Sequence, residues 1–319
     1  MRVLVAGGAG FIGRSMCTRL LDRGDEVICV DNLVTGSIGN VKELEGRPNF
    51  TFVESDISTS VEFGDESLDA VVNLACPASP ADFAPLSLEI LRTGSNGVVN
   101  LLELCVRSGA RFLQASTSEV YGDPAVHPQP ESYWGNVNPI GVRSVYDEAK
   151  RFGEAVTMAY RRRHGVEVRI ARIFNTYGPG MRHDDGRVVS NFVTQALRGD
   201  PLTVYGDGNQ TRSLCFVEDE VTGLLALLES GIPTPVNIGN DDERTVGEIA
   251  ALVIELSGSR SEISHLPLPA DDPAQRRPDL TVARTELGWA PSTPLREGLA
   301  RTIEWFRNSG EWSRSSASR

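Results

Sequence analysis

The stretch RVLVAGGAGFIG, residues 2–13, decides the fold. It joins a short apolar strand to a glycine-spaced turn at Gly7, Gly10 and Gly13, and a helical pattern follows directly. In this GxxGxxG arrangement the glycines allow a tight turn, a close approach of the backbone to a pyrophosphate, and close packing of the helix. Because the helix N-terminus also attracts negative charge, the pattern predicts a dinucleotide site between the first strand and the first helix.

The first half of the chain continues with alternating strand and helix patterns. Apolar runs predict strands at 26–30, 50–54, 68–75, 111–115 and 166–173, and long helical patterns lie at 86–108 and 142–164. Such an alternation builds a parallel sheet that is covered by helices on both faces. We therefore expect an α/β protein with a Rossmann-type doubly wound parallel sheet.

The second half has shorter elements and more loops. We expect helices at 188–197, 219–228, 246–256, 281–287 and 295–307, a short strand at 202–206, and Trp289 as a packing residue. This pattern of short elements and loops predicts a smaller C-terminal substrate-binding domain. We assign residues 1–175 to the nucleotide-binding domain, with 213–239 packing back onto it, 176–212 and 240–310 to the substrate domain, and 311–319 to a disordered tail.

Composition limits the partners of the chain. Its 319 residues carry a formal net charge of -12, which argues against nucleic acid or an anionic membrane as a partner. We find neither a signal region nor an apolar stretch of membrane length, so we expect a soluble cytoplasmic protein. The five cysteines lack CxxC spacing and suit free thiols in a reducing compartment. The four histidines form no ligand motif, so we expect no metal site.

Two strand ends add to the predicted dinucleotide site. Asp31 follows the second strand, where a carboxylate accepts hydrogen bonds from the ribose hydroxyls and repels a 2′-phosphate, which favours NAD over NADP. Asp56 and Ile57 end the third strand, where the adenine edge lies in this architecture. The segment 76–80, CPASP, follows the fourth strand at the carboxyl edge of the sheet, and it is either a ligand-binding segment or a rigid connection.

Tyr146 and Lys150 are candidates for proton transfer. Positions four apart lie on one face of a helix, so the amine of Lys150 can sit beside the phenol of Tyr146. A neighbouring cation lowers the pKa of a phenol from its ordinary value of about 10, as a general base acting on an alcohol near neutral pH requires. The spacing by itself is also compatible with an ordinary surface pair. However, the chain has only two lysines, Lys42 and Lys150, and uses arginine at nearly every other cationic position.

With these residues, the chain resembles the extended short-chain dehydrogenases/reductases, and most closely the UDP-glucuronic acid decarboxylases. The resemblance covers nearly the whole length. It rests on PASP at 77–80, ASTSEVYGDPAVHPQ at 115–129, YWGNVNPIG at 133–141, ARIFNTYGP at 171–179, DGRVVSNF at 185–192, PLTVYG at 201–206, and DDP at 271–273 with Arg276.

The resemblance implies a role for each matching residue. Tyr146 is expected to be the base for the sugar 4-hydroxyl, with Lys150 lowering its pKa and holding the nicotinamide ribose. Thr117 is expected to hydrogen-bond the same oxygen, Ser118 and Glu119 to act near carbons 5 and 6, and Arg276 to orient the substrate. The expected NAD contacts are Gly7, Gly10, Phe11, Ile12, Gly13, Asp31, Asn32, Thr35, Gly36, Asp56, Ile57, Leu74, Ala75, Thr93, Tyr146 and Lys150. The expected substrate contacts are Pro80, Glu119, Asn175, Arg187, Asn191, Tyr205, Arg212 and Arg276.

The reaction implied by the resemblance is the NAD-dependent conversion of UDP-glucuronic acid to UDP-xylose through a 4-keto intermediate, with internal recycling of NAD. Among the alternatives, a nucleotide-sugar 4,6-dehydratase has Asp at the position of Ser118, and a 4-epimerase needs no Glu119. The third, an NAD-binding protein without activity, is disfavoured by an intact Thr117, Tyr146 and Lys150. We also expect a homodimer formed through the two long helices.

The chain departs from the family pattern at five positions. It has Asn73 where the family usually has His, Cys76 for Ser, Phe83 for Tyr, Gly94 for Asn, and Gly180 where Arg is common. None of these changes removes a proton-transfer group. Phe83 and Gly180 lie near the expected substrate, so the affinity or the choice of sugar nucleotide can differ.

Overall fold

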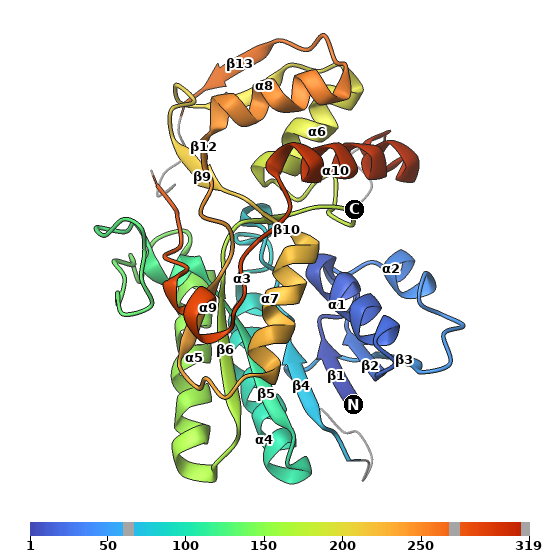
Figure 1. Cartoon of the computed structure of the whole chain (residues 1–319), viewed down its shortest axis with the longest axis vertical. Helices are drawn as coiled ribbons and strands as arrows, with labels where there is room; N and C mark the ends of the chain where they lie inside the picture. The colour runs from blue at the N-terminus through green and yellow to red at the C-terminus, as the bar shows by residue number, and fades with distance from the viewer. Residues whose placement is uncertain (60–66, 268–274, 314–319) are drawn as a thin grey trace.

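A seven-stranded parallel sheet organises the computed structural model, which describes residues 1–59, 67–267 and 275–313 (Figure 1). Its strands are β1 (Arg2–Ala6), β2 (Glu26–Asp31), β3 (Phe50–Glu54), β4 (Ala70–Asn73), β5 (Arg111–Thr117), β6 (Val168–Ile173) and β11 (Pro235–Ile238). Their order is β11-β6-β5-β4-β1-β2-β3, so the direction of winding reverses between β1 and β4. The predicted doubly wound Rossmann-type sheet is confirmed, and ligands bind such sheets at this switch point.

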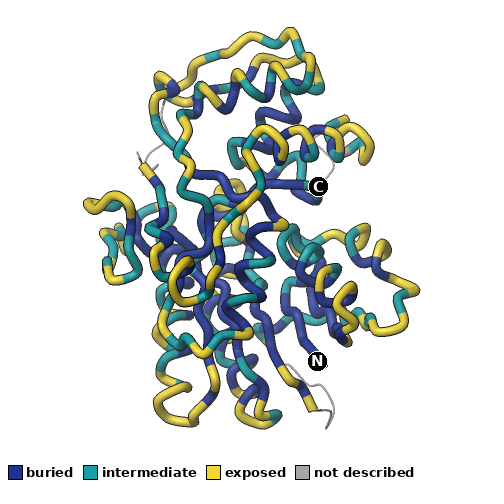
Figure 2. The backbone as a smooth tube through the Cα atoms, in the orientation of Figure 1, coloured by how far each residue is buried: buried dark blue, intermediate teal, exposed yellow. Residues whose placement is uncertain are grey.

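Helices cover both faces of the sheet because successive strand residues point to opposite sides. On β1, Val3 and Val5 join the core beneath α1 (Phe11–Asp22) and α7 (Val217–Glu229). Leu4 and Ala6 join the core beneath α4 (Val98–Ser108) and α5 (Ser144–His164). Figure 2 shows the sheet as a buried layer inside helices whose outer sides are exposed.

The helix expected at 86–108 is not continuous. It consists of α3 (Ser87–Arg92), a π-helical turn at Thr93–Gly97 and α4. At this turn a Cβ on Gly94 would lie 2.6 Å from the Cβ of Ala149, so α5 packs directly against the backbone. The periodicity of the sequence did not reveal the turn, because an inserted residue shifts the helix face without breaking the apolar pattern.

Other boundaries differ from the prediction by a few residues. The fourth strand is shorter than 68–75, the fifth extends to Thr117, and α5 begins at Ser144 instead of 142. The extension of β5 is paired with β6 through Thr117 and Ile173. The extension places Thr117 at the carboxyl edge of the sheet.

The remaining elements form a smaller layer above that edge (Figure 1). Its core lies among α6 (Val188–Arg198), α8 (Val246–Ser257) and α10 (Leu295–Ser309). Three two-stranded ribbons accompany them: β7 (Thr176–Tyr177) with β10 (Cys215–Phe216), β8 (Leu202–Tyr205) with β13 (Ile263–Leu266), and β9 (Thr211–Ser213) with β12 (Glu243–Thr245). Two short helices lie outside this layer, beside the main sheet: α2 (Ile38–Lys42) next to α1, and α9 (Thr281–Glu286) against β11 (Figure 1).

Trp289 is buried and packs over Gly223 of α7, as predicted. Residues 311–313, assigned to the disordered tail, instead form a short 3-10 helix, η4 (Glu311–Ser313), where Trp312 packs against the core of the smaller layer. The rest of that tail, 314–319, and the DDP motif at 271–273 lie outside the described residues. No helix in the described part is long and apolar enough to cross a membrane.

Candidate active site

Two adjoining cavities run along the carboxyl edge of the sheet and together contain every predicted site residue. The larger, about 410 Å³, is lined by all the predicted catalytic and substrate-contacting residues. The smaller, about 360 Å³, is lined by Asp31, Asn32, Thr35, Gly36, Asp56, Ile57, Leu74, Ala75 and Thr93. Gly7, Gly10, Thr35, Leu74 and Cys76 line both, and Phe11, Ile12 and Gly13 line the larger one. The cavities therefore meet at the glycine turn.

The glycine turn has the shape that a dinucleotide pyrophosphate requires. Gly7 has a φ of +79°, and a Cβ there would lie 2.7 Å from the backbone nitrogen of Ala75. A Cβ on Gly13 would collide with the carbonyl oxygen of Gly7. Gly10, the N-cap of α1, supplies no capping side chain, so the first backbone N–H groups of α1 face an anion site. These residues fit NAD.

Asp31 lies in the smaller cavity, as an NAD-selecting carboxylate would. It is buried, and it accepts hydrogen bonds from the backbone nitrogens of Ala9 (3.1 Å) and Leu33 (2.9 Å). Burial raises its pKa, while these two hydrogen bonds oppose the rise. Asn32 Nδ2 donates to Asp56 Oδ2 over 3.2 Å, which joins the ends of β2 and β3 on the floor of the cavity.

Tyr146 and Lys150 lie on the same face of α5, as predicted, with Lys150 Nζ 5.6 Å from the centroid of the Tyr146 ring. The Lys150 amine donates to the carbonyl oxygen of Ala115 over 2.9 Å. The predicted lowering of the Tyr146 pKa is wrong for this arrangement. Burial raises the Tyr146 pKa, and the charges of Cys76 and Glu119 raise it further, against a hydrogen bond with Thr117 and the charge of Arg187. Burial also lowers the pKa of Lys150.

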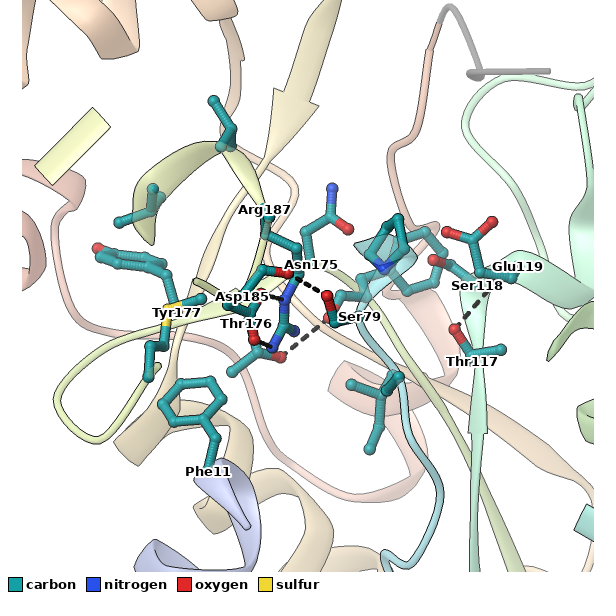
Figure 3. A pocket seen from close by; sticks show the side chains of 18 of the residues that line it. Phe11, Ser79, Thr117, Ser118, Glu119, Asn175, Thr176, Tyr177, Asp185 and Arg187 are labelled. Carbon is teal, nitrogen blue, oxygen red and sulfur yellow. Dashed lines mark hydrogen bonds and ion pairs between the residues drawn. The ribbon is translucent and has the colours of Figure 1, made fainter. Parts of the chain in front are cut away.

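Thr117, Ser118 and Glu119 lie together at the end of β5, where the strand passes into the 3-10 helix η3 (Ser118–Tyr121) (Figure 3). Thr117 Oγ1 accepts a hydrogen bond from the backbone nitrogen of Glu119 over 3.2 Å. Arg276 Nη1 lies 3.3 Å from Ser118 Oγ and 2.5 Å from Glu119 Oε1. The fold therefore brings Arg276 against the Thr-Ser-Glu segment, from which it is separated by more than 150 residues of sequence.

Arg187 lies across the larger cavity from Glu119, at the N-terminus of α6 (Figure 3). Its guanidinium is held by both carboxylate oxygens of Asp185, with Nη2 2.7 Å from Oδ2. Asn175, Asn191, Tyr205 and Arg212 line the same cavity, and Arg212 Nη1 donates to the Thr211 carbonyl oxygen over 2.8 Å. The guanidinium groups of Arg187 and Arg212 can offset the repulsion that an acidic protein exerts on an anionic ligand.

Two contacts of the site were not expected from the sequence: the stacking of Phe83, which was expected only to lie near the substrate, and the ion pair of Arg143. Phe83 stacks on the Tyr146 ring with centroids 5.0 Å apart and an angle of 18° between planes. Arg143 Nη2 donates to Glu119 Oε2 over 2.7 Å, opposite Arg276. A signal for Arg143 was available, since it precedes Tyr146 by three residues and so falls on the same helix face. No such signal exists for the stacking of Phe83. Among the described residues there is no cluster of three or more metal-ligating side chains.

Comparisons with known proteins agree with this geometry. Residues 3–239 match the model of the NAD dependent epimerase/dehydratase family. The chain belongs to this family, within the extended short-chain dehydrogenases/reductases. A UDP-glucuronic acid decarboxylase of Arabidopsis thaliana is 51% identical over 308 residues, which cover 96% of this chain and 89% of the relative.

Solved structures of the family share the fold. A UDP-glucose 4-epimerase of Thermotoga maritima, with UDP-glucose, is 31% identical with a TM-score of 0.88, and the match covers 97% of this chain and 99% of that one. A dTDP-glucose 4,6-dehydratase of Streptomyces venezuelae, with NAD bound, is 30% identical with a TM-score of 0.88, and the match covers 98% of this chain and 99% of that one. The prediction of an NAD enzyme of this superfamily is confirmed.

Proposed function

We propose that this protein is a UDP-glucuronate decarboxylase that produces UDP-xylose and carbon dioxide, with NAD as a recycled cofactor. The observation that carries the proposal is the contact of Arg276 with both Ser118 and Glu119 beside Tyr146. This contact is consistent with the pattern of the decarboxylases, in which a Thr-Ser-Glu segment occurs together with this arginine. The 51% identity to a decarboxylase over nearly the whole chain supports it as well.

The residues of the site can act in the order in which the bonds of the sugar break. Bound NAD would supply the acceptor for a hydride from carbon 4 of the sugar and the donor for its later return. Tyr146 accepts the proton of the 4-hydroxyl, and the resulting ketone stands in a β relation to the carboxylate on carbon 5. The bond to that carboxylate breaks and its electrons enter an enolate, whose oxygen Thr117 and the protonated Tyr146 stabilise through preorganised hydrogen bonds. Protonation at carbon 5 then precedes reduction of the ketone.

The alternatives within the family start with the same oxidation. A 4,6-dehydratase must deliver a proton to a departing 6-hydroxyl, and the hydroxyl of Ser118 is a poor acid for that step. A 4-epimerase has no need for the carboxylate of Glu119, which this chain holds between two guanidinium groups. Both features favour decarboxylation.

The test is an assay of the NAD-loaded protein with UDP-glucuronate, in which mass spectrometry follows the sugar nucleotide and a trap collects carbon dioxide. We expect UDP-xylose and carbon dioxide in equal amounts. UDP-glucose and dTDP-glucose serve as parallel substrates. Turnover of either one without decarboxylation of UDP-glucuronate would replace this assignment with an epimerase or a dehydratase.

We further propose that two copies pair through α3 and α5. Leu88 and Leu91 on α3 and Phe152 on α5 are 59%, 39% and 45% exposed, which is unusual for large apolar side chains on adjacent helices. Light scattering of the purified protein tests the pairing, and a strict monomer at working concentration would exclude it.

The domain division and the compartment also remain proposals. The main sheet draws on residues 2–173 and 235–238, while a separate core forms between residues 177 and 306, which supports two domains with 213–239 returning to the first. The five free cysteines suit a reducing compartment such as the cytoplasm.

A further inference from the structure

Gln129 is a fully buried residue in the loop between η3 and α5. Its backbone nitrogen donates to the Arg277 carbonyl oxygen over 2.9 Å, and its backbone oxygen accepts from the Asp279 nitrogen over 2.9 Å. Its side-chain Oε1 accepts from the Arg277 backbone nitrogen, also over 2.9 Å. One residue of this loop therefore fixes the backbone of the segment that directly follows Arg276.

The same segment brings Arg276 to the predicted catalytic residues. The Arg276 side chain is buried, its Nη1 lies 2.5 Å from Glu119 Oε1, and its Nη2 donates to the Gly122 carbonyl oxygen over 2.9 Å. Glu119 belongs to η3, and Gly122 is the C-cap of that helix. Arg276 itself lies in neither a helix nor a strand. Its backbone must therefore be held in place by other contacts.

Asn237 of β11 connects the two sides of this arrangement. It is fully buried, and its Nδ2 donates to the backbone oxygen of Gln129 over 2.9 Å. Its Oδ1 accepts from the hydroxyl of Tyr121 over 2.7 Å. Tyr121 is the last residue of η3, the helix that carries Glu119. A single side chain of the main sheet thus contacts both the loop that holds the Arg276 segment and the helix that Arg276 contacts.

We propose that Gln129 is a positioning residue, which holds the Arg276 guanidinium against Ser118 and Glu119 by fixing the backbone of the Arg276 segment. Gln129 is not among the described residues that line the two cavities, so it acts through Arg276. A displacement of about 1 Å at a group that aligns a substrate can cost about 100-fold in rate. The inference rests on the proposed function, in which Arg276 orients the sugar.

The carboxamide of Gln129 can be tested apart from its backbone. The backbone hydrogen bonds do not depend on the side chain, whereas the bond to the Arg277 nitrogen needs an acceptor at this reach. The Nε2 of Gln129 donates to the Val126 carbonyl oxygen over 2.8 Å. Gln129→Met keeps a similar volume in this buried place and removes the hydrogen bonds of the carboxamide.

The experiment is a double-mutant cycle with Arg276, in which the NAD-loaded protein decarboxylates UDP-glucuronate. We expect Gln129→Met to lower kcat/KM about tenfold and Arg276→Ala to lower it about 100-fold. Since Gln129 acts through Arg276, the double variant should remain within about twofold of Arg276→Ala. Two independent effects would instead multiply to about 1,000-fold.

Gln195→Met is the matched control. Gln195 is a half-buried residue of α6, and its Oε1 accepts from the Thr203 backbone nitrogen over 3.1 Å. Its carboxamide contacts lie within the smaller layer and do not include the Arg276 segment. Gln195→Met should therefore change kcat/KM by the same factor whether or not Arg276 is present.

The outcomes separate the inference from the function. NAD content and a cooperative thermal transition show which variants are folded, and Gln129→Asn, whose carboxamide is one methylene shorter, replaces Gln129→Met if the latter does not fold. If the unmodified protein does not decarboxylate UDP-glucuronate, the function and this inference both fail. If it does, but the Gln129 variants keep near-normal kcat/KM or their effect multiplies with that of Arg276→Ala, only the role of Gln129 is wrong.

Discussion

Burial is the main cause of the raised pKa of Tyr146. The phenol loses contact with water and lies near Glu119, so its pKa rises although Lys150 is close. A base of this kind works only when its partners are in place, among them Thr117 and the positive charge of an oxidised nicotinamide. The phenol is therefore expected to act in the assembled complex and not in the free protein.

Replacing Tyr146 by Phe tests this role, because the ring and its stacking on Phe83 survive while the proton acceptor is lost. We expect the variant to retain NAD and to lose at least about 100-fold in kcat. Steady-state assays and the NAD content of the denatured protein check both parts. Near-normal turnover would remove Tyr146 from the mechanism.

Glu220 on α7 is a buried carboxyl that the proposed mechanism does not use. It is fully buried, its Oε2 accepts from Thr176 Oγ1 over 3.2 Å, and its Oε1 has no hydrogen-bond partner. Burial raises its pKa to about 8, so the folded protein keeps the proton that an unfolded chain releases above pH 4.5. By linkage, the folded state binds more protons across this window, and its stability falls as the pH rises from about 4.5 to 8.

Glu220→Gln should remove that loss. We expect the variant and the unmodified protein to differ little near pH 4.5, and the variant to gain roughly 4 kcal/mol in unfolding free energy by pH 8. Urea denaturation at a series of pH values measures the difference. Glu218→Gln on the exposed side of the same helix is the matched control, and an equal gain there would point to net charge instead of burial.

At the scale of elements, the π-helical turn between α3 and α4 sets how closely α5 approaches. Gly94 faces Ala149, one residue before Lys150, and has no room for a Cβ. The turn thus places Thr93 in the smaller cavity and packs against the helix whose Tyr146 and Lys150 line the larger one.

Gly94→Ala should overpack this contact and destabilise the protein by about 1–3 kcal/mol, measured by chemical denaturation. Combining it with Ala149→Gly removes the opposing methyl group, so the double variant should recover part of the loss. A purely additive pair would mean that the two residues do not contact each other in solution.

At the scale of the whole molecule, short contacts join the segment after β4 to the loop that carries Arg187. Asp82 Oδ2 pairs with Arg182 Nη2 over 3.0 Å, and Ser79 Oγ donates to the carbonyl oxygen of Asp185 (Figure 3). The 3-10 helix η1 (Pro80–Asp82) therefore connects the nucleotide-binding sheet to the smaller layer across the larger cavity. These contacts suit a rigid connection, while Cys76, Ala78, Ser79 and Pro80 also line the larger cavity, as a ligand-binding segment would.

Asp82→Asn should loosen this connection. We expect KM for UDP-glucuronate to rise about fivefold with a smaller change in kcat, because the Arg187 loop loses one anchor while Tyr146 keeps its place. The Asp22–Arg47 pair also spans 3.0 Å but lies exposed within the first half, so Asp22→Asn is the matched control. A fall in kcat at constant KM would assign Asp82 to the chemical step.

Local patterns in the sequence were enough to predict the doubly wound sheet and the NAD-binding turn, because these depend on apolar periodicity, glycine spacing and residues at strand ends. Gly7, Asp31 and Tyr146 could be located this way. The other expected site residues, such as Thr117, Glu119 and Arg276, came from the resemblance to a family. Tertiary structure alone decided the pairing of Arg143 with Glu119, the stacking of Phe83, the direction of the Tyr146 pKa and the interruption before α4. Each of these depends on distance, burial and charge between segments far apart in the chain, and no local pattern encodes them.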